Sequence, residues 1–508
     1  MLTRRTVLKQ GGYAALASSI PLLIRPVRAQ TATFDFYIST SGNDSNPGTL
    51  ASPWSITALN SQHSVYAGKR VGIIAGTYNT YTLNQAGAWS KPGLSVNGGT
   101  ASSPTYVASC DTSGNYSPRA ATLTALSPSG AYPTNESGII GQAYGTVANS
   151  GNVTLDGLVV TGSYEYGIVF YPGGGSASTE GGPSGVTIQN CEISNISGYE
   201  NDNLGGILLW SLTGVLVHNC KIYNCVPTSG ELGNQDCAGI FSFYCHSNIY
   251  EYNTIYNTTC GIYDKNAPNG NHTYRYNYIE QSKAVGPYAL FAFMDCAGGN
   301  SGDVSVAHHN ILIAPQTWSG TNPSHDPSLS GLKFYNNTCY YSAGGFSLGA
   351  LWFPASASGS SMVTTYNNIF TCNGNPGYQG FLNLVNGSVA LSDYNAYSSS
   401  GAFFGLASAG GSSTWTPTLF AFSAWQAKGF DAHGQIGTPA FASPTSLNPS
   451  GYQLNAGVGK GTGSTTGTTG GTACDMGAWG YDPALGGPPT QIGCNFGPVP
   501  SAPILTVS

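Results

Sequence analysis

VTIQNCEI, at residues 186–193, is the first of seven segments that share one pattern: an apolar strand, a small amide or thiol residue, and a second strand. The other six are VLVHNCKI (215–222), IYEYNTI (249–255), TYRYNYI (273–279), VAHHNIL (306–312), KFYNNTC (333–339) and TTYNNIF (364–370). Their alignment places seven residues in a single column: Cys191, Cys220, Asn253, Asn277, Asn310, Asn337 and Asn368. The steps between these residues vary from 24 to 33, so the insertions lie outside the repeated strands.

A repeat of this size with short strands is typical of a solenoid, in which each unit buries its apolar face by stacking on the next. The asparagine column is typical of a parallel β-helix, because stacked amides at a sharp turn can bond along the axis at the strand spacing of ~4.8 Å. We therefore predict an all-β fold with a single domain, a parallel β-helix that carries the amide column in its core.

A second pattern runs between these segments and supplies another strand of each coil. It reads YGIVFY (166–171), GGILLW (205–210), AGIFSF (238–243), CGIYDK (260–265) and YALFAF (288–293). Strand alternation directs one residue of each segment inward: Ile168, Ile207, Ile240, Ile262 and Leu290. One coil is then expected to hold this strand, the amide-bearing strand, the amide turn, a third strand and a variable loop.

The chain resembles the right-handed parallel β-helix proteins of the pectate-lyase-like superfamily over residues 34–485. Besides the repeats, the resemblance includes FYISTSGNDSNPGTLASPW (36–54), GTY (76–78), GTASSPTYV (99–107) and DMGAWGY (475–481). This resemblance implies that the parallel β-helix is right-handed. Because polysaccharide lyases, glycoside hydrolases, epimerases and phage adhesins share this fold, the resemblance does not settle the function.

The N-terminus carries features of an export signal. The sequence from Thr3 to Lys9, TRRTVLK, resembles a twin-arginine signal, and an apolar stretch from Gly12 to Ile24 follows it. That stretch is shorter than the ~20 residues that a membrane-spanning helix needs. Val27-Arg28-Ala29 fits a cleavage site before Gln30. We expect removal of residues 1–29 and a secreted or periplasmic protein, with an uncleaved anchor as the alternative.

Residues 30–485 are expected to form the β-helix domain and residues 486–508 a C-terminal tail. Residues 30–150 would hold an N-terminal cap and the first coils, and 151–400 contain the clearest coils. The Gly/Thr run at 459–471 predicts a loop. A C-terminal cap is expected within 472–508, because a solenoid needs caps to hide its end strands.

Charge limits the possible partners. The chain has 16 basic and 22 acidic residues, and removal of residues 1–29 takes away five basic ones, which leaves a net charge near −11. This argues against nucleic acid and membrane surfaces as partners. It also disfavours a polyanionic substrate unless a cation or a basic group lies in the groove. We expect a monomer that acts on a polysaccharide without an organic cofactor.

The 12 cysteines do not by themselves predict a disulfide framework. Cys191 and Cys220 occupy one column, where buried thiols pack like small apolar residues. A twin-arginine substrate also folds in a reducing compartment before export. No CxxC pair or His/Cys cluster in the sequence points to zinc.

Aromatic residues dominate the outward positions of the second pattern. The inner outward column is Val169, Leu208, Phe241, Tyr263 and Phe291, and the outer one is Tyr171, Trp210, Phe243, Lys265 and Phe293. Long loops could cover these side chains as a second apolar layer, since exposed aromatic rows are costly. Alternatively they form a groove in which sugar rings stack. The candidate substrate-binding residues are then Tyr171, Trp210, Phe243, Tyr263, Phe293 and His246.

Acidic residues cluster in the two loops that precede neighbouring strands of this pattern: Glu200, Asp202, Glu231 and Asp236. Adjacent coils would bring them about one strand spacing apart, ~5 Å. Close carboxylates are unfavourable unless they share a cation or a proton. The loops therefore predict a Ca²⁺ site with oxygen ligands, the alternative being solvated surface acids.

Lys265 is the one cation in the outer outward column. Between Phe243 and Phe293 it would be partly desolvated, which lowers the pKa of a lysine as a general base requires. Calcium-assisted lyases of the superfamily use lysine or arginine as base, so the arrangement resembles theirs. The first hypothesis is thus a lyase that cleaves a uronic-acid-containing polysaccharide by β-elimination, with Lys265 as base.

Two other functions stay open. A glycoside hydrolase or epimerase would use Asp202 and Asp236 as its catalytic acids. The Asp-Asp and Gly-His-Gly motifs of polygalacturonases are absent, and so is the Arg-x-Pro-x-x-Arg motif of pectate lyases. The third possibility is a carbohydrate-binding protein without catalysis.

Weaker candidates lie on the neighbouring strands. Glu251 and Arg275 are expected to form a cross-strand ion pair. His272 and Asp295 lie near the ends of the second-pattern strands, and alternation points the carboxyl group of Asp264 inward.

Overall fold

The computed structural model of the protein describes most of the chain between residues 33 and 496. The described ranges are 33–85, 91–133, 137–143, 147–171, 182–198, 204–226, 237–258, 260–265, 270–280, 291–294, 304–313, 321–322, 331–341, 351–353, 362–372, 380–385, 389–401, 403–407 and 418–496. Nearly all the regular structure in these ranges is β-strand. No helix in them is long and apolar enough to cross a membrane.

The strands form three twelve-stranded sheets. The first sheet holds β1 (Phe36–Ile38), β2 (Arg70–Ile74), β5 (Thr105–Cys110), β8 (Val153–Asp156), β11 (Val186–Gln189), β14 (Leu216–His218), β17 (Ile249–Glu251), β20 (Thr273–Arg275), β23 (Val304–His308), β26 (Gly331–Tyr335), β29 (Met362–Tyr366) and β32 (Val389–Asp393). The second sheet holds β4 (Lys91–Ser95), β7 (Ser137–Ala143), β10 (Tyr166–Tyr171), β13 (Leu204–Trp210), β16 (Cys237–Phe243), β19 (Cys260–Lys265), β22 (Phe291–Met294), β25 (Thr321–Asn322), β28 (Leu351–Phe353), β31 (Leu382–Val385), β34 (Phe404–Ala407) and β35 (Thr418–Phe420). The third sheet holds β3 (Gly76–Asn79), β6 (Ala121–Thr124), β9 (Val159–Thr161), β12 (Glu192–Ile196), β15 (Lys221–Cys225), β18 (Thr254–Tyr256), β21 (Tyr278–Glu280), β24 (Ile311–Ile313), β27 (Thr338–Tyr341), β30 (Ile369–Cys372), β33 (Ala396–Tyr397) and β36 (Gln435–Ile436).

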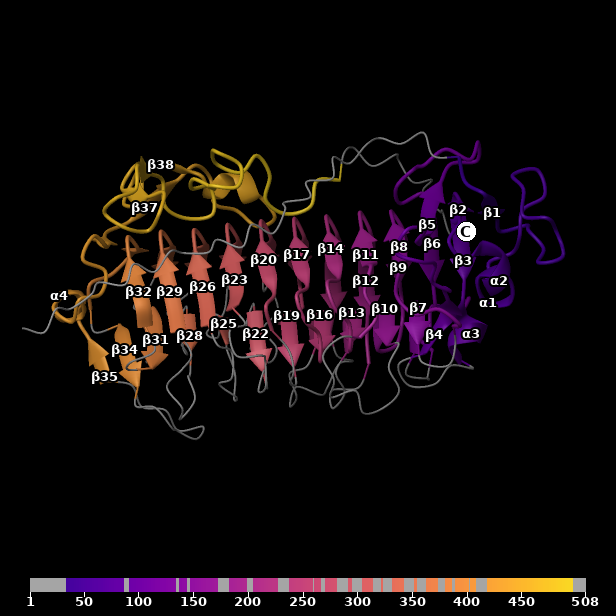
Figure 1. The fold of residues 1–508 in the computed structure, drawn as a ribbon, viewed down its shortest axis with the longest axis horizontal. Helices are drawn as coiled ribbons and strands as arrows, with labels where there is room; N and C mark the ends of the chain where they lie inside the picture. Colours follow the sequence, from indigo (N-terminus) through magenta and orange to yellow (C-terminus); the bar gives the residue numbers. More distant parts are fainter. Residues whose placement is uncertain are drawn as a thin grey trace, which may run out of the picture. The chain divides into compact units, whose positions relative to one another are not determined.

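Each coil contributes one strand to each sheet, as the repeat predicts. β10 of the second sheet leads to β11 of the first, and a short turn leads on to β12 of the third. Successive coils pair in parallel, so strands of one sheet stand side by side in chain order (Figure 1). Only β35, paired with β34, is antiparallel in the described part of these sheets. A parallel β-helix is therefore confirmed.

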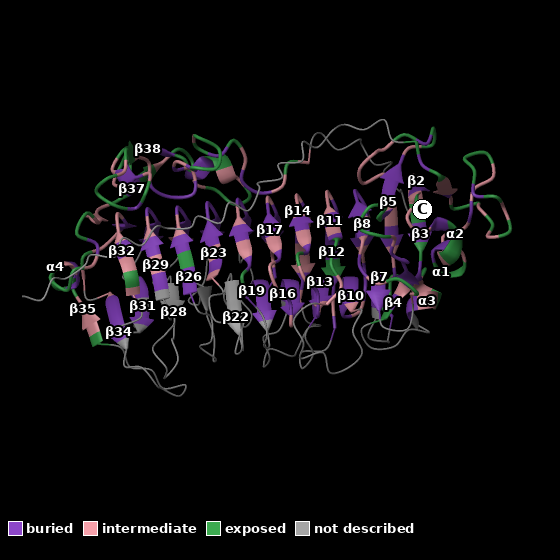
Figure 2. Cartoon of the chain, viewed as in Figure 1, coloured by how far each residue is buried: buried purple, intermediate pink, exposed green. Residues whose placement is uncertain are grey.

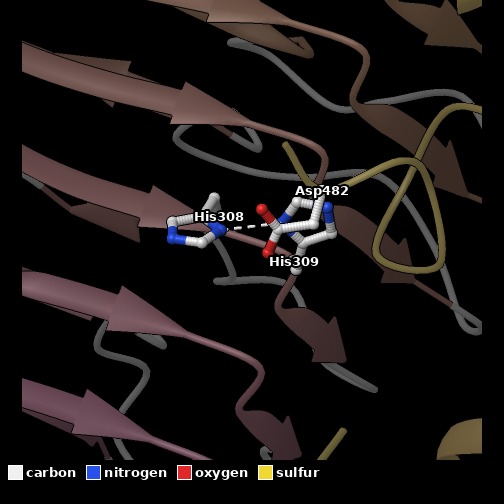
Figure 3. Close-up of side chains that lie close together, drawn as sticks. All are labelled: His308, His309 and Asp482. Carbon is white, nitrogen blue, oxygen red and sulfur yellow. Dashed lines mark hydrogen bonds and ion pairs between the residues drawn. The ribbon is translucent and has the colours of Figure 1, made fainter. Parts of the chain in front are cut away.

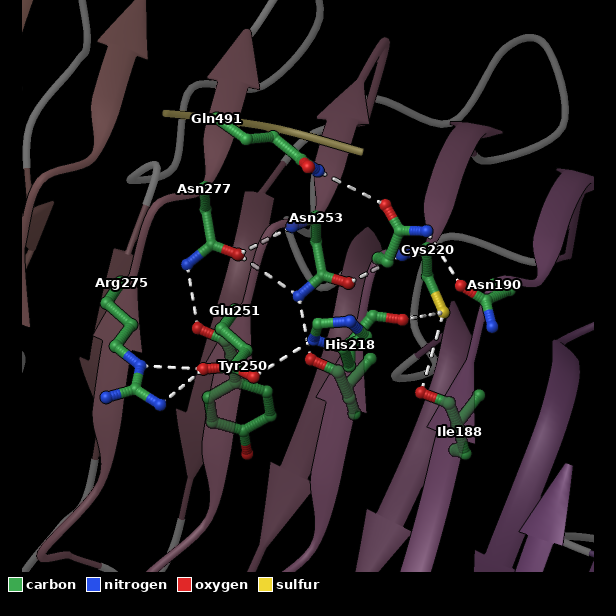
Figure 4. Close-up of polar contacts among 12 residues, drawn as sticks. Ile188, Asn190, His218, Cys220, Tyr250, Glu251, Asn253, Arg275, Asn277 and Gln491 are labelled. Carbon is green, nitrogen blue, oxygen red and sulfur yellow. Dashed lines mark hydrogen bonds and ion pairs between the residues drawn. The ribbon is translucent and has the colours of Figure 1, made fainter. Parts of the chain in front are cut away.

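The amide column lies at the turn between the first and third sheets, as predicted (Figure 4). The Nδ2 group of Asn253 donates to Oδ1 of Asn277 at 3.0 Å, and Asn277 donates in the same way to Asn310 at 3.0 Å. The ladder continues through Asn337 and Asn368. Two residues absent from the predicted column extend it: Asn368 donates to Asn395 at 2.9 Å, and Asn395 to the buried Asp431 at 2.8 Å.

Every amide of the ladder also bonds to the backbone. Oδ1 of Asn277 accepts the main-chain N–H of Asn253 at 3.0 Å, and Nδ2 of Asn277 donates to the carbonyl of Tyr250 at 2.9 Å. The preceding residue has a left-handed backbone, with φ of 56° at Tyr252 and 57° at Tyr276. This conformation turns the chain sharply between the sheets and directs the following asparagine inward. Burial of these amides is tolerated because their hydrogen bonds are satisfied.

The interior between the three sheets is apolar and buried (Figure 2). Ile168, Ile207, Ile240 and Ile262 occupy one inward column with no exposed surface, as predicted. None of the ten cysteines whose side chains the structure describes forms a disulfide, and Cys191 and Cys220 are fully buried in the same core.

Short helices lie at both ends of the stack of coils. α1 (Ala58–Ser61), α2 (His63–Tyr66) and α3 (Tyr81–Gln85) precede the central coils, and α4 (Phe422–Gln426) follows β35 (Figure 1). Leu59 and Tyr66 join the interior core. At the other end, Trp425 of α4 is fully buried and stacks on Phe404 at 5.7 Å between ring centroids.

The segment 437–496, here called the return segment, runs back along the turn between the first and third sheets. It includes β37 (Pro439–Phe441), the 3-10 helix η1 (Pro449–Tyr452), β38 (Leu454–Gly457), β39 (Gly463–Ser464) and β40 (Ala473–Cys474). The main-chain N–H of Ala478 donates to Thr338, that of Cys494 to Thr254, and that of Asn495 to Asn219. Residues 478, 494 and 495, within the region where a C-terminal cap is expected, thus bind along the wall of the coils.

Candidate active site

The outer face of the second sheet carries the predicted aromatic residues in a cluster separate from the interior core. Trp210 stacks on Phe243 with ring centroids 4.6 Å apart, and Tyr171 meets Trp210 edge-on at 5.0 Å. Phe241 meets Tyr263 edge-on at 4.8 Å. We call the set the outer aromatic cluster: Tyr166, Val169, Tyr171, Leu208, Trp210, Phe241, Phe243, Tyr244 and Tyr263.

Most of the outer aromatic cluster is buried, so it forms a second apolar layer. Phe243 is 2% exposed and Tyr263 is 1% exposed. The expectation that these two side chains face solvent as sugar-stacking surfaces is therefore wrong in this structure, because apolar side chains that line up on a sheet are stable when covered. Tyr171 and Trp210 remain half-buried, so both retain some surface for a ligand.

Lys265 is the last residue of β19 and pairs with Phe243 on one side and Met294 on the other. It thus shares a register column with Trp210 and Phe243, as predicted. The flanking residue Phe293 was expected in the same column, but it pairs with Asp264. The segment YALFAF is one residue out of the predicted register: Phe291, not Leu290, pairs with Ile262. Its nearly continuous apolar sequence lacks the alternation that marks the inward face.

Asp264, directly before Lys265, points into the interior of the coil and is 1% exposed. Its carboxyl group accepts hydrogen bonds from the hydroxyl groups of Tyr274 and Tyr250, and Nε2 of His272 lies 3.8 Å away. Burial raises the pKa of Asp264 to about 7, against the lowering effect of hydrogen bonds from Tyr274, Ser242 and Tyr250. The inward carboxyl group thus anchors the end of β19, next to its last residue, Lys265.

The histidines near this strand end have structural partners. Nδ1 of His272 accepts the main-chain N–H of Asn248 at 3.0 Å, and the N–H of His272 donates to Ser305. Burial, with His246 as a second cause, lowers the pKa of His272 to about 3, so the ring is neutral. His246 is half-buried at the turn that follows β16, with its Nδ1 2.9 Å from the hydroxyl group of Ser247.

Known proteins share this architecture. A family described as a right-handed β-helix region matches residues 126–301. The structure of pectate lyase Pel9A is similar with a TM-score of 0.50 and 16% sequence identity, over 87% of this chain and 95% of that one. The chain has the fold of a right-handed parallel β-helix. At this identity the likeness concerns the fold.

Other structures match this β-helix less well. A rhamnogalacturonan lyase is 13% identical, with a TM-score of 0.37 over 74% of this chain and 86% of that one. A GH136 lacto-N-biosidase from Eubacterium ramulus is 12% identical, with a TM-score of 0.36 over 71% and 67%. No curated protein matches the sequence.

The predicted acidic cluster of the β-helix lies outside the described residues. This applies to Glu200, Asp202, Glu231 and Asp236, and also to Asp295. The strands that follow the two acidic loops are neighbours: Leu204, the first residue of β13, pairs with Cys237, the first residue of β16. This agrees with the premise that both loops enter the second sheet on adjacent coils, and the calcium site stays a prediction.

A polar column crosses the outer face of the first sheet (Figure 4). Glu251 accepts from Nη2 of Arg275 at 2.5 Å, from Nε of Arg275 at 2.6 Å and from Nδ1 of His218 at 2.9 Å. Burial alone would raise the pKa of Glu251, but the hydrogen bond from His218 and the charge of Arg275 hold that pKa below its ordinary value. The predicted ion pair between Glu251 and Arg275 is confirmed. Because the carboxylate of Glu251 already accepts hydrogen bonds from Arg275 and His218, a structural role is favoured.

One cluster of potential metal ligands has no counterpart in the sequence analysis. Asp482 of the return segment lies beside His308 and His309 at the end of β23, and all three side chains are buried (Figure 3). The histidine pair is visible in the sequence, but no local signal predicts that a carboxylate 173 residues later reaches it.

Proposed function

We propose that this β-helix protein is a secreted lyase that cleaves a uronic-acid-containing polysaccharide by β-elimination. The observation that carries the proposal is the register of Lys265, which shares a column with the half-buried Trp210 and the buried Phe243. A cationic residue at the edge of an apolar layer is suited to proton abstraction, because desolvation lowers the pKa of a lysine.

The proposed reaction needs one base and one stabilised charge. The amine of Lys265 takes the proton from C5 of a uronate, the C4–O bond to the next sugar breaks, and a C4–C5 double bond forms. The leaving oxygen takes up a proton from water or an acid. The negative charge that develops on the carboxylate needs positive charge or hydrogen-bond donors nearby.

The structure supplies a reason for the position of Lys265. The preceding Asp264 is held in the interior by Tyr250 and Tyr274, which fixes the end of β19. A catalytic base gains from such support because misplacement of a reacting group by about 1 Å can cost about 100-fold in rate. Trp210 and Tyr171 then offer ring surface for a sugar on the coils that precede Lys265.

Calcium is a further element of the proposal. Glu200, Asp202, Glu231 and Asp236 are the residues that would hold Ca²⁺, which would neutralise the substrate carboxylate when bound. The mature chain is strongly acidic, so binding of a polyanion needs such a cation. The similarity in fold to a pectate lyase is consistent with this substrate class.

The product identifies the reaction. The full-length protein should be incubated with a panel of uronic-acid polymers, with and without a chelator, while the ultraviolet absorbance of the unsaturated uronate end is followed. The proposal predicts absorbance on at least one polymer, and Ca²⁺ should restore activity after chelation. New reducing ends without absorbance would instead show hydrolysis, with Asp202 and Asp236 as the residues to test next. Binding without any cleavage would favour a carbohydrate-binding protein.

A further inference from the structure

The cluster of His308, His309 and Asp482 has a local backbone cause. Consecutive residues of a strand normally face opposite sides of the sheet. His308 ends β23, and His309 adopts a left-handed conformation with φ of 53°. The change of conformation brings both imidazole rings to the same region, with their centroids 5.0 Å apart. Asp482 enters from the return segment, so the cluster joins two distant parts of the chain (Figure 3).

The two imidazoles face each other through like atoms. Nδ1 of His308 lies 2.7 Å from Nδ1 of His309. At this distance two unprotonated nitrogens would repel each other through their lone pairs, and two protonated nitrogens would repel each other through their hydrogens. Either one proton or one cation must lie between them. Oδ2 of Asp482 is 4.0 Å from Nδ1 of His309, and the three ligand atoms all lie within 4.8 Å of one another.

These separations are close to what a tetrahedral metal requires. Metal–nitrogen bonds of about 2.0–2.1 Å place neighbouring ligand atoms about 3.3 Å apart. The observed 2.7 Å and 4.0 Å lie on either side of that value, and the third separation is at most 4.8 Å, so changes of no more than about 1.5 Å would bring all three to the distance that a tetrahedral metal needs. Two imidazoles and one carboxylate are ligands that suit Zn²⁺ and its neighbours, whereas Ca²⁺ prefers oxygen ligands alone.

The surroundings hold the three groups in place. Nε2 of His309 lies 3.1 Å from Nδ2 of Asn336, close to the backbone of Gly480 and Tyr481. Oδ1 of Asp482 accepts the N–H of Ala484 at 2.8 Å, and Oδ2 accepts from the hydroxyl group of Tyr276. Hydrogen bonds of this kind orient a metal ligand by holding those of its atoms that do not bind the metal.

Both histidines of the cluster are shielded from solvent. His308 is 6% exposed and His309 is fully buried.

We propose that His308, His309 and Asp482 form a binding site for a divalent transition metal of the Zn²⁺ class, which fastens the return segment to the wall of the β-helix. The metal would bridge β23 and residue 482 across 173 positions of sequence. Its role is structural: the site lies on the side of the first sheet that the return segment covers, while Lys265 belongs to the second sheet. The proposal therefore does not depend on the proposed lyase activity.

Metal content of the full-length protein tests the site. The purified protein is loaded with Zn²⁺, dialysed against metal-free buffer, and analysed for bound metal; Co²⁺ is bound in parallel for its absorption spectrum. We expect about one equivalent per chain and a tetrahedral Co²⁺ spectrum. The Asp482→Asn variant keeps an oxygen for the Tyr276 hydroxyl group but removes the charged ligand, so its affinity should fall at least about tenfold.

A matched control distinguishes a three-ligand site from an ordinary histidine–carboxylate pair. Nδ1 of His433 lies 2.8 Å from Oδ2 of Asp393 at a half-exposed position, and Asp393→Asn should leave the bound metal unchanged. Limited proteolysis supplies a second readout, since Zn²⁺ should protect the return segment in the wild type and not in Asp482→Asn. Wild-type protein that retains less than about a tenth of an equivalent, with no protection by Zn²⁺, would overturn the proposal and leave a shared proton between the two rings.

Discussion

The amide turn between the first and third sheets and the outer face of the second sheet lie on the same coils, yet different forces hold their side chains. At the turn, each asparagine makes directional bonds of about 3 Å to the next coil and to the backbone. On the second sheet, rings pack at 4.6–5.0 Å with stacked and edge-on geometries mixed. The directional bonds join asparagines on successive coils from Asn253 to Asn395, whereas apolar packing accepts Val169, Leu208, Phe241 and Tyr263 in one column.

The stability and the proposed function of the protein depend on different regions of the coils. A buried amide ladder cannot vary without leaving polar groups unpaired. Substitutions in an outer apolar layer cost little stability, so a lysine is tolerated there on one coil. We therefore expect substitutions at the turn to change stability, and substitutions on the second sheet to change catalysis.

The largest expected effect is on the catalytic rate. Lys265→Ala should lower kcat/KM by about 10²–10⁴-fold on the polymer that the wild type cleaves, because this is the contribution of a positioned base. Lys265→Arg should restore little, since the pKa of arginine is higher than that of lysine and is not easily lowered. Kinetics of product absorbance, alongside circular dichroism to verify the fold, measure this. Unchanged activity in Lys265→Ala would remove the lysine from the mechanism.

The second effect concerns pH and the buried carboxyl group of Asp264. Its folded pKa, about 7, exceeds its ordinary value of 3.8. Below pH 3.8 both states hold the proton and the contribution to stability is complete. As pH rises toward 7 the unfolded state ionises first, so the free energy of unfolding decreases, by about 4 kcal/mol for this group, and does not change further above pH 7.

Asp264→Asn isolates that contribution. The variant keeps a side chain of similar shape but cannot ionise, so its free energy of unfolding should decrease less than that of the wild type between pH 4 and 7. Denaturant unfolding at several pH values provides the comparison. Parallel pH profiles for the two proteins would show that Asp264 ionises in the folded state as readily as in water.

The third effect is the loss of stability when the ladder is interrupted. Asn310→Ala leaves the amide of Asn277 and Oδ1 of Asn337 without their bonds to the removed side chain, at a cost of about 2–4 kcal/mol in the free energy of unfolding. Asn455→Ala, at an exposed position in β38, serves as the control and should change stability by less than about 0.5 kcal/mol. Equal losses for both variants would contradict a special role for the ladder.

The smallest effect is on substrate binding. Trp210→Ala should raise KM by about threefold to tenfold with little change in kcat, because stacking of a ring surface contributes about 1 kcal/mol beyond burial. Tyr223→Ala is the matched control, since Tyr223 stacks on Tyr256 at 4.9 Å on the outer face of the third sheet. A larger rise in KM for Tyr223→Ala would place the substrate on that sheet instead.

The sequence predicted the amide turn because a small amide or thiol residue recurs there at each coil. The same reasoning placed Lys265 correctly beside Phe243, where alternation is clear, and misplaced Phe293, because all six residues of YALFAF are apolar or aromatic. The burial of Phe243 and Tyr263 could not be read from strands alone, since it depends on what packs over them.

Long-range contacts were beyond the sequence pattern. The end of the ladder at Asp431 and the meeting of His308 and His309 with Asp482 depend on segments that carry no repeat. The left-handed conformation of His309 also breaks the alternation on which strand reasoning relies. Only the fold of the whole chain brings these residues together.

The separation of stability from catalysis is tested most directly by the initial rate of Asn310→Ala, measured below its unfolding transition and compared with that of Lys265→Ala. We predict that Asn310→Ala retains a rate within about threefold of the wild type despite its lower stability, whereas Lys265→Ala loses at least about 100-fold with its stability unchanged. Comparable losses of rate in the two folded variants would contradict the account.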